Sequence, residues 1–265
     1  MAAVTATARA TPADPVAPPP RIAGHGTSEA EWRAAGWLDA LPRWNIRTLL
    51  GDARRLVVVA PHPDDEVLGA GGLIAAAAAL GLPVWILALT DGEACYPDAP
   101  SLPPAMLARM RRAELDVALN RLGVQSGGVE HFRLPDGMLR HEGAALVGRI
   151  HRLLQPHDLI ATTWARDGHP DHEAAAAAVA EATTCTGCRR LEFPVWGWHW
   201  SHADGRDMPR ERMGRLDLDR GLLARKLWAM RAFRSQTGRG IDVDAPILPD
   251  RVLARFRRSF EVFVR

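Results

Sequence analysis

The sequence has little cysteine, little lysine and little net charge. Three cysteines among 265 residues are too few, and too odd in number, for a disulfide framework. The net charge is +2, and the basic residues are almost all arginines scattered among acids, with Lys226 as the single lysine. Because no basic patch stands out, we expect no nucleic-acid partner.

The sequence also lacks a long apolar run. None reaches the roughly 18 residues that a membrane-spanning helix needs, so we expect no membrane span. The first residues show no basic segment followed by an apolar one, and therefore do not resemble a secretory signal. A cytoplasmic location follows as the expectation. Residues 1–25, rich in alanine and proline, predict a disordered tail, and residues 26–265 predict a single domain.

Apolar runs rich in β-branched residues alternate with helical patterns through most of the chain. Buried strands are predicted at 56–60, 84–90, 130–134 and 158–163, with later strands at 191–195 and 259–264. Helices are predicted at 28–44, from 67 onward, and at 105–122, 142–154, 170–182 and 222–235. Such alternation predicts an α/β fold, a Rossmann-like three-layer sandwich with a mainly parallel sheet.

One stretch, residues 56–72, places charged side chains directly after a buried strand. Its sequence is LVVVAPHPDDEVLGAGG, in which His62, Asp64, Asp65 and Glu66 follow the apolar run. Four ionisable groups at the end of a core strand are costly to place there for packing alone. In open α/β sheets, ligands bind at the carboxyl ends of the strands. This turn is therefore a candidate functional site.

A second cluster, His169-Pro170-Asp171-His172, lies at the start of a predicted helix and also follows a strand. Pro170 suits the first turn of a helix, so both imidazoles lie near its N-terminus. A hydrolytic zinc site takes three protein ligands and keeps one position open. Either cluster alone could be a helix cap or a structural histidine. Together, at the carboxyl edge of one sheet, they predict a metal site.

These paired motifs resemble the LmbE/PIG-L superfamily of zinc-dependent de-N-acetylases. Its members include N-acetylglucosaminyl-phosphatidylinositol deacetylase and the deacetylases and amidases of the mycothiol pathway. The resemblance extends over residues 56–236. Features between and after the motifs agree with it, namely Thr90-Asp91-Gly92-Glu93, Arg111 with Glu114, Asp136-Gly137, and residues 226–236. The resemblance implies a deacetylase domain of the LmbE type.

The resemblance also implies roles for individual residues. The ligands of a Zn²⁺ cofactor would be His62, Asp65 and His172. Asp64 would be the general base that takes a proton from the attacking water.

Three further roles follow from the resemblance. His169 would either stabilise the developing oxyanion or protonate the leaving amine, and Asp171 would orient an imidazole. Arg111 and Asp136 resemble residues that hold sugar hydroxyls. The expected partner is a small N-acetylated sugar or glycoconjugate.

We therefore expect a hydrolase that removes an N-acetyl or other N-acyl group from an amino sugar or sugar conjugate. An amidase acting on a non-sugar conjugate is the alternative within enzymes. A catalytically silent metal-binding or carbohydrate-binding module is an alternative of another class, although an acid and a base beside the metal argue against it. A phosphoesterase would usually need two metals, and the sequence offers ligands for one.

Two other features have simpler interpretations. Trp196, Trp198 and Trp200 alternate like one face of a strand, which indicates core packing or a stacking wall for a sugar or acyl group. Cys185 and Cys188 have the spacing of a redox motif, but without a second pair a surface turn is the expectation.

Overall fold

The computed structural model describes residues 22–265 except 126, 185 and 244. Its strands are β1 Arg55–Ala60, β2 Val84–Thr90, β3 Gly127–Leu134, β4 Asp158–Thr163, β5 Arg189–Phe193, β6 Met213–Asp217 and β7 Phe260–Val264. The α-helices are α1 Glu29–Ala35, α2 Ile46–Leu50, α3 Asp65–Ala79, α4 Pro104–Leu122, α5 Gly143–Leu153, α6 Pro170–Ala182, α7 Gly197–Trp200, α8 Arg220–Met230, α9 Arg234–Thr237 and α10 Asp250–Leu253. Short 3₁₀ helices lie at Trp37–Ala40, Leu139–His141, Arg210–Arg212 and Ala254–Phe256.

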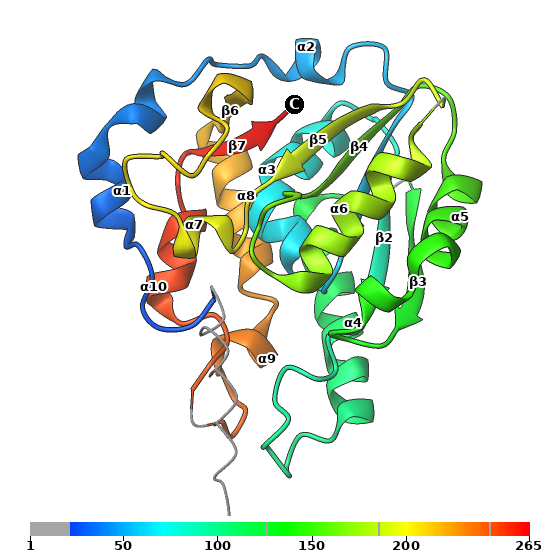
Figure 1. The fold of residues 1–265 in the computed structure, drawn as a ribbon, viewed down its shortest axis with the longest axis vertical. Coiled ribbons are helices and arrows are strands. Elements are labelled where there is room, and N and C mark those ends of the chain that lie inside the picture. The colour runs from blue at the N-terminus through cyan, green and yellow to red at the C-terminus, as the bar shows by residue number, and fades with distance from the viewer. Residues whose placement is uncertain (1–21, 126, 185, 244) are drawn as a thin grey trace, which may run out of the picture.

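The described strands form one seven-stranded sheet in the order β3-β2-β1-β4-β5-β7-β6 (Figure 1). The pairs from β3 to β5 are parallel, whereas β7 runs antiparallel to both β5 and β6. The mainly parallel α/β sandwich predicted from the sequence is therefore confirmed. The chain proceeds outward from β1 to β2 and β3, then returns to pair β4 with β1. The carboxyl ends of β1 and β4 thus form the switch point where such sheets bind ligands.

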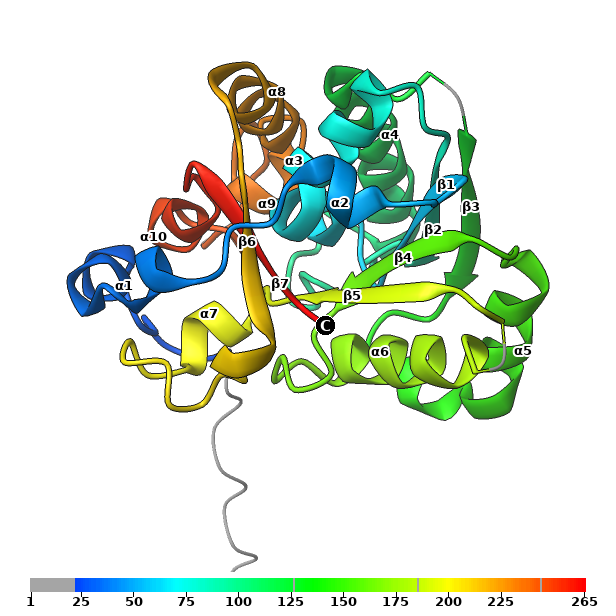
Figure 2. The ribbon, with the colours of Figure 1, turned by 90° about the horizontal axis from the view of Figure 1, so that it is seen from above.

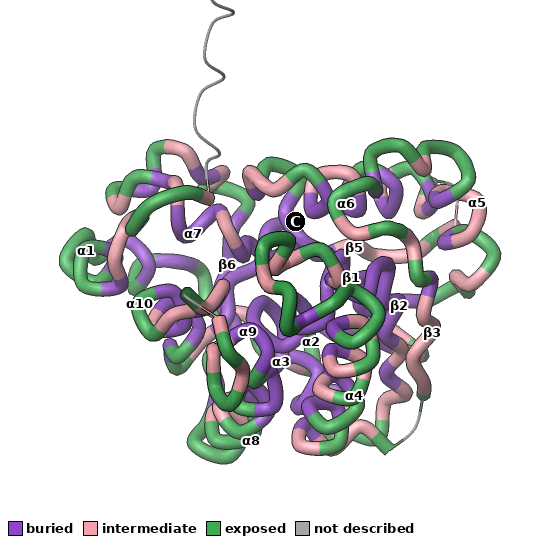
Figure 3. The backbone as a smooth tube through the Cα atoms, turned by 90° about the horizontal axis from the view of Figure 1, so that it is seen from below, coloured by how far each residue is buried: buried purple, intermediate pink, exposed green. Residues whose placement is uncertain are grey.

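Alternate residues of β1 face two separate apolar cores. Leu56 and Val58 belong to the core under α3, α4 and α8, and Val57 and Val59 belong to the core under α5 and α6. Figure 2 shows these helix layers on opposite sides of the sheet. In Figure 3 the buried backbone runs through β1 and β2, while exposed turns lie at α5 and α8. None of the helices in the described ranges is long and apolar enough to cross a membrane.

A buried ion pair fills a break in α3. The helix is interrupted at Ala70, where φ is −136° and ψ is 16°. The Lys226 ammonium donates to the Leu68 carbonyl at 2.9 Å and lies 2.6 Å from the Glu261 carboxylate. Glu261 in turn accepts the backbone N–H groups of Gly72, at 2.7 Å, and of the next residue, at 2.9 Å. The pair therefore satisfies backbone groups that the break would leave unpaired.

The structure corrects several predicted boundaries. The helix expected over residues 28–44 ends at Ala35, because Gly36 adopts a left-handed cap, and continues as the 3₁₀ turn Trp37–Ala40. The helix expected over 222–235 ends at Met230, and the chain turns so that Phe233 is buried before α9 begins.

The tryptophan segment and β6 also differ from expectation. The segment expected to alternate like a strand is the helical turn α7. Strand β6 has no counterpart among the predicted strands. A disordered tail was predicted over residues 1–25, and residues 1–21 of it lie outside the described residues. The remaining part is described, and its Ala23 and His25 carbonyls accept hydrogen bonds from His199 and Arg255.

Candidate metal centre

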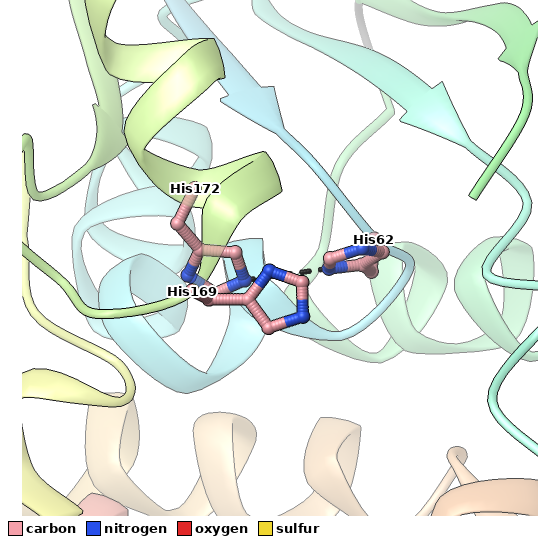
Figure 4. Close-up of side chains that lie close together, drawn as sticks. All are labelled: His62, His169 and His172. Atoms are coloured by element: carbon pink, nitrogen blue, oxygen red, sulfur yellow. Dashed lines mark hydrogen bonds between the residues drawn. The ribbon is translucent and has the colours of Figure 1, made fainter. Parts of the chain in front are cut away.

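Two loops bring the predicted site residues together at the switch point. Strands β1 and β4 are neighbours, with Val59 opposite Thr162, so the turn after β1 lies beside the loop after β4. Figure 4 shows His62 on the first loop and His169 and His172 at the start of α6, with the three imidazoles converging.

Three donor atoms form a compact triangle. Nδ1 of His62 and Nε2 of His172 each lie 3.2 Å from Oδ2 of Asp65, and they lie 3.3 Å from each other. Ligands about 2.0–2.1 Å from a tetrahedral zinc ion are separated by about 3.3 Å, so this set fits such an ion. Asp65 is buried and its Oδ2 also accepts the backbone N–H of His62 at 3.0 Å, which fixes the carboxylate within the turn.

In His62 and His172, the ring nitrogen that lies outside the triangle contacts a buried carboxylate. Nε2 of His62 lies 3.3 Å from Asp171, and Nδ1 of His172 lies 2.7 Å from Asp167. Such contacts fix the ring and leave the other nitrogen free to bind a metal. Although burial alone lowers it, Asp65 and Asp167 raise the pKa of His172 to about 9. The site therefore has the electrostatics of a cation-binding position.

Asp167 was not among the residues selected from the sequence. Besides His172, its carboxylate accepts the backbone N–H groups of Val195, Trp196 and Gly197 at 2.8 to 2.9 Å. It is fully buried. In the sequence, only its position between a strand and a histidine-bearing helix could have indicated this residue. The three backbone partners of Asp167 lie almost thirty residues away along the chain.

His169 is oriented differently from the other two histidines. It caps α6, and its Nδ1 accepts the backbone N–H of Asp171 at 3.2 Å. Burial, together with the neighbouring His172 and His62, lowers the pKa of His169 to about 3. The ring is therefore neutral near pH 7, and its single proton resides on Nε2, the nitrogen that the cap leaves free. His169 lines the cavity described below.

Asp64 has an uncommon backbone conformation, with φ at 140°. Burial, with the charge of Asp65 adding to it and Arg111 opposing it, raises its pKa to about 7. Its Oδ2 lies 3.2 Å from Nη2 of Arg111, and its backbone N–H donates to Glu66. A buried carboxyl beside the donor triangle is thus kept close to its protonation midpoint at neutral pH.

Arg111 and Asp136 each have partners within the protein. The Arg111 guanidinium is buried and donates to the carbonyls of Pro63 and Gly92 at 2.8 and 2.9 Å, so it braces the loop that follows β1. Asp136 accepts the Ala94 backbone N–H at 2.9 Å through Oδ2, and its Oδ1 lies 3.1 Å from Nε2 of His62. Both residues also line the cavity.

The cavity beside the triangle has a volume of about 540 Å³. Six of the eight residues selected from the sequence line it: His62, Asp64, Asp65, Arg111, Asp136 and His169. The other two, Asp171 and His172, lie fully buried behind it. Trp196 is the only residue of the tryptophan trio that lines this cavity, since Trp198 is packed against Trp32 and Trp200 is stacked on Trp164.

Two groups of side chains among the described residues could hold a metal ion. One contains His62, His169 and His172, and the other contains His62, Asp136 and Asp171. Both include His62 and adjoin the triangle. Nδ1 of His169 is occupied by a backbone N–H, and Asp171 accepts the N–H groups of Gly137 and Leu139. The triangle with Asp65 has three donor atoms that lie 3.2 to 3.3 Å apart, the spacing that a tetrahedral ion requires.

Comparisons with known proteins identify relatives of this chain. Residues 57–183 match the family described as GlcNAc-PI de-N-acetylase, or PIG-L. A 1D-myo-inositol 2-acetamido-2-deoxy-alpha-D-glucopyranoside deacetylase of Rhodococcus erythropolis is 30% identical over 66% of this chain and 67% of its own length. The corresponding Rhodococcus opacus protein is 34% identical over 57% of this chain and 59% of its own. In two further relatives the match spans 45% and 60% of the relative's own length.

Solved structures share the fold. The conserved protein TT1542 from Thermus thermophilus superposes with a TM-score of 0.55 and 27% identity, over 79% of this chain and 93% of that chain. Its agreement extends the likeness beyond the matched family segment. The chain belongs to the PIG-L family of de-N-acetylases.

Proposed function

We propose that the protein is a zinc-dependent hydrolase that removes an N-acetyl or related N-acyl group from an amino sugar or sugar conjugate. The observation that carries the proposal is the triangle of His62, Asp65 and His172, with donor atoms 3.2 to 3.3 Å apart and carboxylates behind both imidazoles. These three residues would hold the ion. Asp171 and Asp167 would orient the imidazoles.

The chemistry needs a base and an oxyanion donor beside the ion. A bound zinc ion supplies a Lewis acid that polarises the scissile carbonyl and activates water. Asp64 would accept the proton of the attacking water, because burial raises its pKa to about 7, the range suited to a base at neutral pH. Arg111 holds the Asp64 carboxylate and the carbonyl before it, and so fixes the position of the base.

His169 would donate a hydrogen bond to the oxyanion rather than begin the reaction as a charged acid. Its Nδ1 is occupied by a backbone N–H, so its neutral ring presents Nε2–H to the cavity. A fixed donor at the developing charge typically contributes about 10²–10³-fold in rate. Of the two roles considered for His169, this geometry favours oxyanion stabilisation.

The substrate class is supported by the relatives and by the polar cavity residues. The two Rhodococcus relatives are named as deacetylases of an acetamido sugar linked to inositol. Asp136, with its carboxylate at the cavity surface, would accept hydrogen bonds from sugar hydroxyls, and Arg111 would contribute to the same part of the cavity.

The test is acetate release from a panel of N-acetylated sugars and conjugates, followed by mass spectrometry, with zinc content measured on the same samples. Chelation should abolish release, and added zinc should restore it. Asp64→Asn should lower kcat by about 10²–10⁴-fold and keep its zinc, since it loses only a base. Asp65→Asn should lose zinc affinity as well. Full acetate release from protein without a transition metal would contradict the proposal.

A further inference from the structure

Helix α4 carries an apolar stripe on its outer face. Met106 and Val117 are 39% and 43% exposed, and Met110 and Ala113 lie between them in the sequence. The spacings of four, three and four residues place these side chains on one face of the helix, because residues three and four apart are neighbours on its surface. The opposite face of α4 is packed in the core. The stripe itself is therefore left in contact with water.

A tryptophan of α8 extends the stripe. Trp228 is 55% exposed, which makes it the most exposed large apolar side chain among the described residues. Arg121, one turn after Val117, donates to the Trp228 carbonyl at 2.9 Å, and its Cζ lies 5.3 Å from the centre of the indole ring. Figure 2 shows α4 and α8 on the same side of the sheet. We name these side chains the α4 patch: Met106, Met110, Ala113, Val117 and Trp228.

The stripe is symmetric about its own midpoint. Met106 and Val117 are equally distant from the point between residues 111 and 112, and so are Met110 and Ala113. If a second copy of α4 packs antiparallel about this point, Met106 meets Val117 of the partner subunit, and Met110 meets the partner's Ala113. A surface that is complementary to itself in this way is what a two-fold symmetric interface requires.

Two charged side chains flank the stripe on the same side of α4. Arg109 and Asp116 are exposed, and neither forms an ion pair with another of the described residues. They are seven residues apart, or about 10.5 Å along the helix axis, which is too far for contact with each other. In the antiparallel arrangement Arg109 is offset by about 3 Å from Asp116 of the partner subunit, a distance that its long side chain spans. The two copies would thus form two reciprocal ion pairs.

We propose that the α4 patch is the interface of a two-fold symmetric homodimer, in which the α4 helices of two copies pack antiparallel. Trp228, at one end of the patch, then covers the first turn of the partner's α4. Helix α4 has 19 residues and is about 28 Å long. One helix from each copy gives an interface at the small end of the stable range, which is about 1,200–2,000 Å². We therefore expect a dissociation constant of about 1–10 μM.

Sedimentation velocity of the zinc-loaded full chain tests the proposal. As the concentration rises from about 0.5 to about 100 μM, the mass should rise from the 28.9 kDa of the monomer towards twice that value. Val117→Asp should weaken the dimer by about 100-fold or more, because it would bury a carboxylate in an apolar contact. Met106→Asp should act in the same way from the other end of the stripe. One informative variant therefore remains if the other does not fold, which circular dichroism checks.

Met138→Asp is the matched control. Met138 is 45% exposed, and the residue after it, Leu139, belongs to the core under α5 and α6, on the other side of the sheet from α4. This variant should dimerise like the wild type.

Charge reversal tests the antiparallel arrangement. Arg109→Glu and Asp116→Arg each place like charges at both reciprocal contacts, so each variant alone should weaken the dimer by about tenfold. An equimolar mixture of the two variants has opposite charges at both contacts of the mixed dimer. The mixture should therefore associate about as tightly as the wild type.

The outcomes are distinct. Loss of the dimer in the two aspartate variants of the stripe, with recovery in the mixture of charge variants, supports the proposal. A wild-type chain that is monomeric at every concentration overturns it and assigns the patch to another partner. A dimer that both Val117→Asp and Met106→Asp retain uses another face and overturns it as well. A mixture no more associated than its two components overturns the antiparallel arrangement.

Discussion

Asp167 offers a sharp test of how the metal site is organised. Its carboxylate has no unused oxygen: Oδ1 accepts the N–H groups of Val195 and Gly197, and Oδ2 accepts that of Trp196 and contacts Nδ1 of His172. In Asp167→Asn one oxygen becomes an NH₂ group. If this group faces His172, Nδ1 must accept its hydrogen bond, the ring proton must reside on Nε2, and the nitrogen in the donor triangle can no longer bind a metal.

The opposite orientation of the amide is also unfavourable. The NH₂ group would then face the N–H groups of Val195 and Gly197, and donors would oppose donors in a buried site. Leaving a buried polar group unpaired costs about 1–3 kcal/mol. Loss of an outer partner of a metal-binding histidine typically lowers metal affinity by 10–100-fold, or about 1.4–2.7 kcal/mol. We therefore expect Asp167→Asn to lose zinc affinity by that factor, with reduced stability.

The assay is competition for zinc against a chromophoric chelator, with urea denaturation of the metal-free protein beside it. Asp204→Asn is the matched control, because the Asp204 side chain is 60% exposed and lies outside the cavity. It should bind zinc like the wild type. Wild-type zinc affinity in Asp167→Asn would refute the reasoning, since His172 would then not depend on this carboxylate for its tautomer.

Three other predictions concern the buried charges. Lys226→Met should destabilise the protein by about 3–5 kcal/mol, because it leaves Glu261 buried without its cation, and adding Glu261→Gln should restore part of the loss in urea denaturation. Equal stability of the single variant and the double variant would contradict this. Arg111→Lys should lower kcat and the denaturation midpoint together, since a lysine cannot replace both carbonyl contacts, and an unchanged kcat would remove this residue's bracing role. The metal-free protein should lose stability as pH rises from 7 to 9: the pKa of His172 is raised to about 9 and burial raises that of Glu66 to about 8, so the folded state releases both protons later than the unfolded state. A midpoint in urea with chelator that is flat over this range would contradict the assignment.

Local patterns predicted the parts of the fold where chemistry changes abruptly along the chain. Strands β2 and β4 and helix α6 begin and end where the sequence indicated, because apolar runs there meet charged residues or proline. His169 and His172 lie at the start of α6, and His62 follows β1, whose end at Ala60 was also predicted. For that reason the loops of His62 and His169 could be placed at one sheet edge before any contact was known.

The features that the sequence did not reveal depend on distant contacts. Strand β6, with sequence MGRLD, has no strand pattern of its own and is stabilised by pairing with β7. The position of Asp167 depends on the N–H groups of residues 195–197, and the cavity is lined by segments over two hundred residues apart in the chain. Tertiary contacts, rather than local propensity, determine these structures.

The central claim is that His62, Asp65 and His172 hold the metal. The most direct measurement is an anomalous difference map collected at the zinc absorption edge from crystals of the zinc-loaded protein. The account predicts one peak about 2.0–2.1 Å from Nδ1 of His62, Oδ2 of Asp65 and Nε2 of His172. A peak on the far side of the same imidazole, between Nε2 of His62, Asp136 and Asp171, or no peak at the triangle, would contradict it.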